Sequence, residues 1–170
     1  MLKFLFPGLT APPQRGAALL DAVTRKAREP HWYLAGEVPD TLDGRFRVVA
    51  TLTALVLVRL EQEGEAGDRL SVALTERFIE VMESEHRELG LGDPTLGRTV
   101  RKLVGSLSRR VELWRAVAKA DKDWNEAARE SVYAGESKPD ALGHSADSLR
   151  VFWKRLQAVD AGALAEGRIE

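Results

Sequence analysis

Residues 38–60 read VPDTLDGRFRVVATLTALVLVRL, a polar start followed by the longest apolar stretch of the chain. Turn-forming and helix-capping residue types gather at its start, and Asp43 is placed to cap a helix that begins near Gly44. The apolar positions that follow cover most of the circumference of a helix that runs to about Gln62. A helix that is apolar on nearly every side needs neighbours all round, so we predict that it lies at the centre of a bundle.

Outside this segment, apolar residues recur at the spacing typical of amphipathic helices, and no alternating strand pattern is present. Glycine and proline indicate a loop at 30–43, a break at 64–67 and a second loop at 134–144. Five further helices are predicted, at about residues 15–28, 68–89, 95–120, 122–133 and 145–159.

The predicted fold class is all-α, a single-domain bundle of about six helices whose short connections favour antiparallel neighbours. A chain of 170 residues suits one such domain. We expect residues 1–14 to be an N-terminal segment, 15–160 the helical domain, and 161–170 a flexible tail of small and polar residues.

Composition excludes several classes of function. The chain has no cysteine, so it forms neither disulfides nor thiolate sites, and a net charge of −1 creates no overall attraction to nucleic acid or anionic lipid. Met1–Leu9 contains only a short apolar run, and Val48–Val58 falls well short of the ~20 residues that span a bilayer. We therefore expect a cytoplasmic protein.

Charge is nevertheless segregated along the chain. Residues 61–93 hold ten acids against three arginines, whereas residues 95–120 hold seven basic residues against one acid. On a helical wheel, the cations opposite the apolar stripe of the second segment are Arg98, Arg101, Lys102, Arg109 and Lys119. This strip is either a solvated face or a docking surface for ribosomal RNA, lipid headgroups or an acidic protein. No aromatic residues are interleaved with it, which argues against sequence-specific RNA recognition.

Residues that could support catalysis are sparse. Glu83 and His86 have the i, i+3 spacing found in di-iron bundles, but the second such pair is missing. Asp40 and Asp43 are close enough in sequence for acid–base work, although a turn and a helix cap explain them better. Nucleophile, phosphate-loop and dinucleotide motifs are absent from the sequence. We predict no catalytic residue, metal or cofactor.

Four tryptophans stand out in a chain that is only 6% aromatic. Trp114 and Trp153 lie on apolar stripes and are predicted to be core residues. Trp32 and Tyr33 lie in the first loop, where they either anchor the loop to the bundle or present an aromatic hot spot to a partner.

Two motifs together resemble the ubiquinol–cytochrome c chaperone family, over roughly residues 15–135. The first is a Pro-Asp-Thr-x-Asp-Gly-Arg-Phe run from Pro39 to Phe46, followed by an apolar helix that ends in Arg59-Leu60. The second is the turn of Gly90, Gly92 and Asp93, which leads into a basic helix with Gly97, Arg98, Arg101 and Lys102. One departure is Leu52, which stands where the family often has a histidine.

The resemblance implies a helical protein that assists assembly of the respiratory cytochrome bc complex and is not an enzyme. Mitochondrial members bind newly made cytochrome b, act with a small partner protein and associate with the mitochondrial ribosome. Here the domain starts almost at Met1 without an organellar presequence, which favours a bacterial form. We expect any contact with the inner membrane to be peripheral.

We therefore predict an assembly chaperone that binds cytochrome b or another immature subunit. The candidate partner-binding residues are Trp32, Tyr33, Asp40, Asp43, Arg45, Arg98, Arg101, Lys102 and Arg109. A structural role is the alternative for the first motif, with Asp43 as cap, Arg45 bridging a buried carboxylate or carbonyl, and Phe46 in the core. The alternative functions are a ribosome- or RNA-associated adaptor and a metal-binding helical enzyme.

Overall fold

The computed structural model describes residues 16–88, 90 and 93–169, and this part of the chain is helical with no strand. The predicted all-α bundle is therefore confirmed. In chain order its elements are α1 (Ala17–Ala27), η2 (Pro30–Trp32), α2 (Leu42–Leu60), α3 (Gly64–Glu88), α4 (Asp93–Ala120), α5 (Trp124–Ala128), η3 (Arg129–Tyr133), α6 (Pro139–Gln157) and α7 (Ala161–Ala165).

The central position of α2 is confirmed. Every residue from Val48 to Leu60 is buried, and the helix packs against α1, α3, α4, α6 and η3. Thr51 and Thr53 are tolerated there because their hydroxyls donate to the backbone carbonyls of Arg47 and Val49, one turn earlier. The segment that is apolar on nearly every side thus organises the fold.

The cap of α2 differs from the prediction. Thr41, not Asp43, is the N-cap, and its Oγ1 accepts from the backbone N–H of Gly44 at 3.1 Å. Asp43 lies in the first turn, where its carboxylate accepts from Arg47 Nε at 2.7 Å. The earlier start is possible because residue 44 is glycine: a Cβ there would lie 1.9 Å from the carbonyl oxygen of Pro39.

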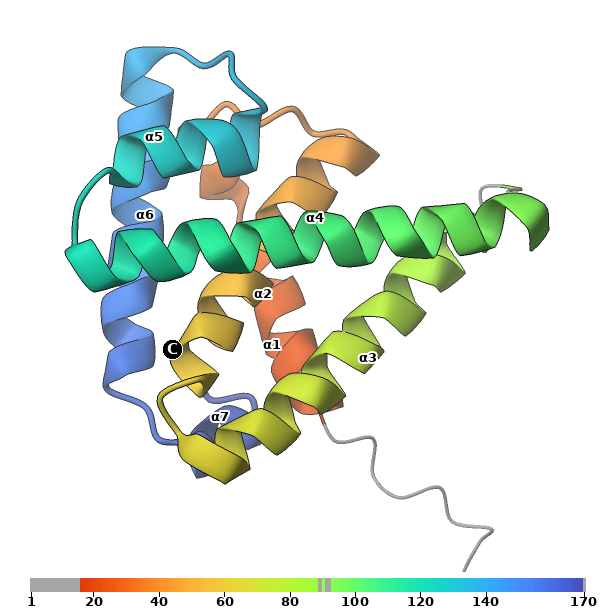
Figure 1. Cartoon of the computed structure of the whole chain (residues 1–170). Helices are drawn as coiled ribbons and strands as arrows, with labels where there is room; N and C mark the ends of the chain where they lie inside the picture. The colour runs from red at the N-terminus through yellow and green to blue at the C-terminus, as the bar shows by residue number, and fades with distance from the viewer. Residues whose placement is uncertain (1–15, 89, 91–92, 170) are drawn as a thin grey trace, which may run out of the picture.

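The two longest helices, α3 and α4, cover α2, and α4 runs across the front of the bundle in Figure 1. Their apolar stripes are buried as predicted, with Leu74, Phe78, Leu107 and Trp114 almost fully enclosed. The predicted break at 64–67 is shorter than expected, because α3 already begins at Gly64. Gly67 lies inside the first turn, where a Cβ would collide with the carbonyl oxygen of Leu60.

The bounds of the later helices also differ from the predicted ranges. The predicted helix at 122–133 is divided into α5 and the π-helical turn η3, and α6 begins at Pro139 rather than near residue 145. Proline suits the first turn of a helix, and a single glycine weakens a helix without ending it, so α6 contains both Pro139 and Gly143. As a result His144 lies on a helix and not in a loop.

Residues 161–169, within the segment predicted to be a flexible tail, include the short helix α7. Asp160 caps α7 by accepting from the N–H of Ala163, and Leu164 and Ile169 are buried. Two isolated apolar residues are enough to hold this segment against the bundle, because both side chains pack into the hydrophobic core. Arg59, near the end of α2, fixes this region by donating to the carbonyl oxygens of Leu156 and Val159 at 2.9 and 2.8 Å.

No helix in the described ranges is both long and apolar enough to cross a membrane.

Candidate functional site

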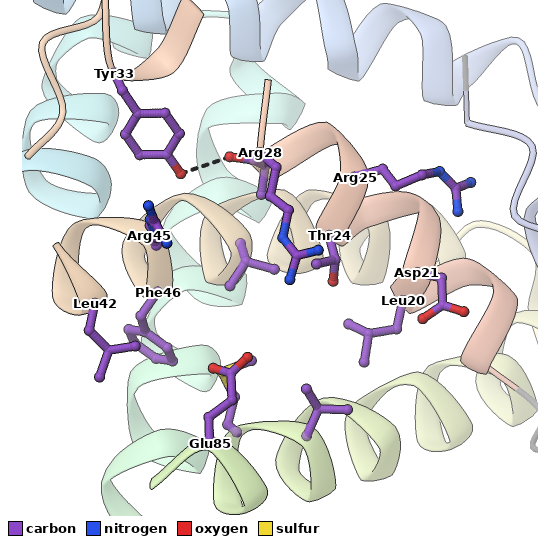
Figure 2. Close-up of a pocket in the computed structure, with 14 residues that line it drawn as sticks. Leu20, Asp21, Thr24, Arg25, Arg28, Tyr33, Leu42, Arg45, Phe46 and Glu85 are labelled. Atoms are coloured by element: carbon purple, nitrogen blue, oxygen red, sulfur yellow. Dashed lines mark hydrogen bonds between the residues drawn. The ribbon is translucent and has the colours of Figure 1, made fainter. Parts of the chain in front are cut away.

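A groove of about 470 Å³, here called the α1–α3 groove, opens between α1, the first turns of α2 and the last turns of α3. Figure 2 shows the side chains of these three helices facing a common space. Its apolar wall is made by Leu20, Leu42, Phe46, Val49, Val81 and Met82. Leu42 remains 49% exposed at the entrance, so the groove offers apolar surface to a partner.

Charged side chains form the rim of the groove; they are Asp21, Arg25, Arg28, Arg45 and Glu85. Arg45 Nε donates to Asp40 Oδ1 at 2.6 Å, and both side chains are exposed. This hydrogen bond lowers the pKa of Asp40 and raises the pKa of Arg45. Arg45 therefore does not bridge a buried carboxylate or carbonyl, because it points outward from the first turn of α2.

The two aromatic residues of the first loop differ in burial and in what they contact. Trp32 is fully buried and donates from Nε1 to the carbonyl oxygen of Lys26 at 2.9 Å, so it anchors the loop and presents no hot spot. Tyr33 is half-buried in the wall of the groove, where its hydroxyl donates to the carbonyl oxygen of Ala27 (Figure 2). Burial raises the pKa of the Tyr33 phenol.

The predicted basic strip lies on the exposed face of α4. Arg98, Arg101, Lys102 and Arg109 are all exposed, and none of them forms an ion pair with a side chain in the described ranges. The structure does not place the whole strip beside the groove. Only Arg109 reaches another candidate residue, because it lines a second cavity together with Asp43.

This second cavity, here called the arginine pocket, has a volume of about 310 Å³ and lies where α2, α4 and η3 meet. Its charged lining residues are Asp43, Arg47, Arg109, Arg110 and Glu130. Arg110 is a residue that sequence reasoning missed. It is buried, it donates to the carbonyl oxygens of Ser106 and Ser131, and its guanidinium lies over the ring of Phe46. An arginine on the apolar side of a helical wheel is the signal that could have found it.

Two histidines that are 113 residues apart meet beside α6. His31 Nδ1 and His144 Nε2 are 3.0 Å apart, and His31 Nε2 is 3.1 Å from Glu29 Oε2. Because Glu29 accepts from Nε2, we assign the free lone pair to Nδ1, which then accepts from His144 Nε2–H. Burial lowers the pKa of His31, and it outweighs the opposing effect of Glu29. No local spacing in the sequence could have paired these residues.

The side chain of His86 is not among those that the structure describes, so the predicted half-motif of Glu83 and His86 lies partly outside the described residues. Within the described ranges, no group of three histidine, aspartate or glutamate side chains is arranged to hold a metal ion.

Comparisons with known proteins agree with the resemblance seen in the motifs. The model of the family described as ubiquinol-cytochrome C chaperone matches residues 35–170. The chain belongs to this family. The match begins later than the predicted resemblance and continues to the C-terminal helices, so it includes α2 to α7 and the whole arginine pocket. It leaves out α1, which supplies one wall of the α1–α3 groove.

The chain is also similar in structure to a solved protein, described as the Cbp3 homolog from Brucella abortus. The TM-score is 0.77 with 24% sequence identity, and the alignment covers 98% of this chain and 94% of that one. At this identity the likeness supports the fold alone. No curated protein matches the chain.

Proposed function

We propose that this protein is a non-enzymatic assembly chaperone of the respiratory cytochrome bc complex, and that it holds an apolar segment of an immature subunit in the α1–α3 groove. The observation that carries the proposal is an open apolar groove with a charged rim in a member of the ubiquinol–cytochrome c chaperone family. Cytochrome b, the membrane-embedded subunit implied by the family resemblance, is the client we favour.

The groove has the chemistry that an apolar helix needs. An amphipathic or apolar helix binds by placing one face into a hydrophobic groove, and a flexible methionine lets such a groove adapt to different side chains. Leu42, Phe46 and Val81 provide fixed apolar contacts, and Met82 provides the adaptable one. A membrane helix outside its bilayer exposes apolar side chains to water, so burying one face in the groove lowers its tendency to aggregate.

The rim provides contacts that a purely apolar surface lacks. Membrane helices carry lysine and arginine near their ends, and an acidic residue at the groove attracts them. Asp21 on α1 and Glu85 on α3 offer such contacts, while Arg25, Arg28 and Arg45 suit acidic or carbonyl groups of the client. Charges of both signs fix the orientation of the client more than they increase its affinity.

The same proposal includes a location. A bacterial cytoplasmic protein that receives a membrane subunit must approach the inner membrane, and exposed cations favour contact with anionic headgroups. Arg98, Arg101 and Lys102 on α4 are exposed and suit such a peripheral contact.

The test is site-specific photocrosslinking in cells that assemble the bc complex. A photoreactive residue at position 42, in the groove, should form adducts with cytochrome b or another bc-complex subunit. Position 151 on α6 is the matched control, because Val151 is 48% exposed and Leu42 is 49% exposed. The proposal would be contradicted if neither position formed adducts with bc-complex subunits, or if both positions formed them equally.

A matched pair of substitutions adds a functional measurement. Leu42→Asp should reduce recovery of the bc-complex subunit in a pull-down about tenfold, because it places a charge on the apolar wall. Val151→Asp should leave recovery unchanged.

A second candidate function, a ribosome- or RNA-associated adaptor, is favoured by one observation. Arg98, Arg101 and Lys102 are exposed on one face of α4 and have no ion-pair partner among the described side chains. Co-sedimentation with ribosomes across a salt series tests it, because phosphate contacts weaken steeply with salt. Association that is absent at low salt would exclude this candidate.

A further inference from the structure

The arginine pocket holds a buried positive charge whose compensation is incomplete. Arg110 is 9% exposed, and none of the ion pairs formed within residues 16–88 and 93–169 includes it. Its three hydrogen bonds go to uncharged oxygens, two on Ser106 and one on Ser131. Its Nε is buried without a hydrogen-bond partner. Buried charges in proteins are normally paired, so this guanidinium lacks an anion.

Two more guanidinium groups line the same cavity. Arg47 comes from α2, where Asp43 already pairs with it at 2.7 Å, and Arg109 is exposed on α4. Three arginines against Asp43 and Glu130 leave the lining with a net charge of +1. The pKa of Arg110 falls to about 10, first because of burial and then because of the charges of Arg47 and Arg109, which Asp43 and Glu130 oppose.

The donors that remain suit an oxyanion with several oxygens. A guanidinium has five N–H donors, and the hydrogen bonds to Ser106 and Ser131 leave an Nη2–H and the buried Nε–H unused on Arg110, the latter reachable only if the side chain shifts. Arg109 adds a complete guanidinium, and Arg47 adds the donors that Asp43 does not occupy. Carboxylate needs only one bidentate arginine, whereas phosphate has more charge and more acceptor oxygens and suits convergent arginines.

We propose that the arginine pocket binds a phosphate group, carried either by a soluble phosphate compound or by a phospholipid headgroup. This site is separate from the α1–α3 groove and does not depend on the proposed function. The phosphate supplies the counter-ion of Arg110 and joins α2 to α4 across the cavity, so it stabilises the folded protein when bound.

The first experiment uses inorganic phosphate with the full chain. Phosphate is titrated at constant ionic strength, with chloride as the balancing anion, and the melting temperature and the heat of binding are measured. We expect a saturable rise in melting temperature. Arg47→Gln and Arg109→Gln should each weaken binding about tenfold, because each removes charge-assisted hydrogen bonds. Arg69→Gln is the matched control, because Arg69 also pairs with a carboxylate one turn earlier on its helix but lies outside the pocket, and this variant should bind phosphate like the natural protein.

A gain-of-affinity variant separates binding from folding defects. Glu130→Gln removes a carboxylate from the lining, so phosphate should bind about threefold more tightly. A misfolded variant would not show this gain. Equal phosphate binding by the Arg47, Arg109 and Arg69 variants would overturn the proposal, as would acetate binding with the same affinity and the same dependence on the variants.

The second experiment distinguishes the two sources of phosphate. Vesicles of phosphatidic acid in phosphatidylcholine are sedimented with the protein, and pure phosphatidylcholine vesicles are the control. Binding that Arg47→Gln weakens and Arg69→Gln does not supports a lipid headgroup in the pocket. Phosphate binding in solution without vesicle binding supports a soluble compound. Vesicle binding that both variants weaken equally, with no phosphate binding in solution, would overturn the site.

Discussion

The α1–α3 groove and the arginine pocket both use the first turns of α2, but their chemistry is opposite. Phe46 lines both cavities, while Leu42 belongs to the groove and Arg47 to the pocket. The groove has an apolar wall, and the one rim pair described, Arg45 with Asp40, is exposed to water. The pocket has a polar lining and a buried arginine without a carboxylate partner. One segment of the sequence, from residue 39 to residue 49, thus supports two surfaces that suit different ligands.

The charged residues of the two surfaces also differ in what they contribute to stability. Exposed ion pairs contribute little to stability, so the Arg45–Asp40 pair is free to serve recognition. Arg110, in contrast, is buried, so a substitution there is expected to change the stability of the fold as well as the proposed phosphate binding. Substitutions in this segment therefore separate the two surfaces, or remove both.

Gly44→Ala should have the largest effect, because it disturbs both surfaces at once. The new Cβ would lie 1.9 Å from the carbonyl oxygen of Pro39, so the loop before α2 must move. We expect the free energy of unfolding to fall by about 3 kcal/mol in chemical denaturation.

Gly97→Ala in α4 is the control, since a Cβ there meets nothing within 4 Å. That change should raise stability by about 0.5 to 1 kcal/mol through helix propensity. Similar gains for both variants would show that Gly44 is needed for no close contact and differs from alanine only in helix propensity.

Arg110→Gln should affect the pocket and spare the groove. It removes hydrogen bonds to Ser106 and to the buried Ser131, so the free energy of unfolding should fall by about 2 kcal/mol. Urea denaturation measures the loss, and crosslinking from position 42 should stay unchanged in the fraction that folds. If the variant is as stable as the natural protein, the free-energy cost of burying the guanidinium charge equals the stabilisation that its hydrogen bonds provide.

Acidification should weaken the groove and leave the pocket intact. His31 belongs to η2, next to Tyr33 of the groove wall, and its pKa lies below 6.5 because of burial. The unfolded chain therefore takes up protons at His31 more readily than the folded chain. Stability contributed by this residue is present above pH 6.5 and is lost as the pH falls toward the folded pKa.

Between pH 7.5 and pH 5.5 we expect lower stability in thermal melts, and His31→Gln should reduce this dependence on pH. Phosphate binding by the arginine pocket is compared in the same range, with the change in charge of phosphate itself taken into account. An unchanged pH dependence in the His31 variant would assign the effect to other groups.

Asp40→Asn should have the smallest effect on stability. Both partners of the Arg45–Asp40 pair are exposed, so thermal and chemical unfolding should not change measurably. The variant leaves Arg45 unpaired at the rim, and the measured change should appear in the dependence of client recovery on salt. A clear loss of stability would indicate that the pair holds the loop before α2.

Much of the fold could be predicted because the signals are local. The burial of α2 follows from its composition, and the stripes of α3 and α4 follow from their spacing. Helix ends were harder, since Asp40, Thr41 and Asp43 are all capping residue types and only the packed position of Gly44 selects Thr41. The two apolar residues of the tail, Leu164 and Ile169, show no period, so their burial depends on space left by other helices.

The candidate site was predictable only in part. Asp40, Asp43 and Arg45 were selected from a motif and Tyr33 as an aromatic residue of the first loop. The structure places Tyr33, Asp40 and Arg45 at or beside the groove and Asp43 in the pocket. Trp32 was selected as an aromatic residue of the first loop, and the structure buries it in the core. The pairing of His31 with His144, and the burial of Arg110, arise from tertiary packing between distant segments.

The bond from Arg59 to the end of α6 has a consequence for synthesis of the chain. This arginine belongs to the central helix, but the carbonyl oxygens that accept its hydrogen bonds belong to Leu156 and Val159, about a hundred residues later. Until α6 has been made, Glu63 is available to Arg59 as an ion-pair partner. Both carbonyl acceptors are still missing, so the hydrogen bonds that complete the burial of the guanidinium cannot yet form. The protein therefore completes its own core only near the end of translation.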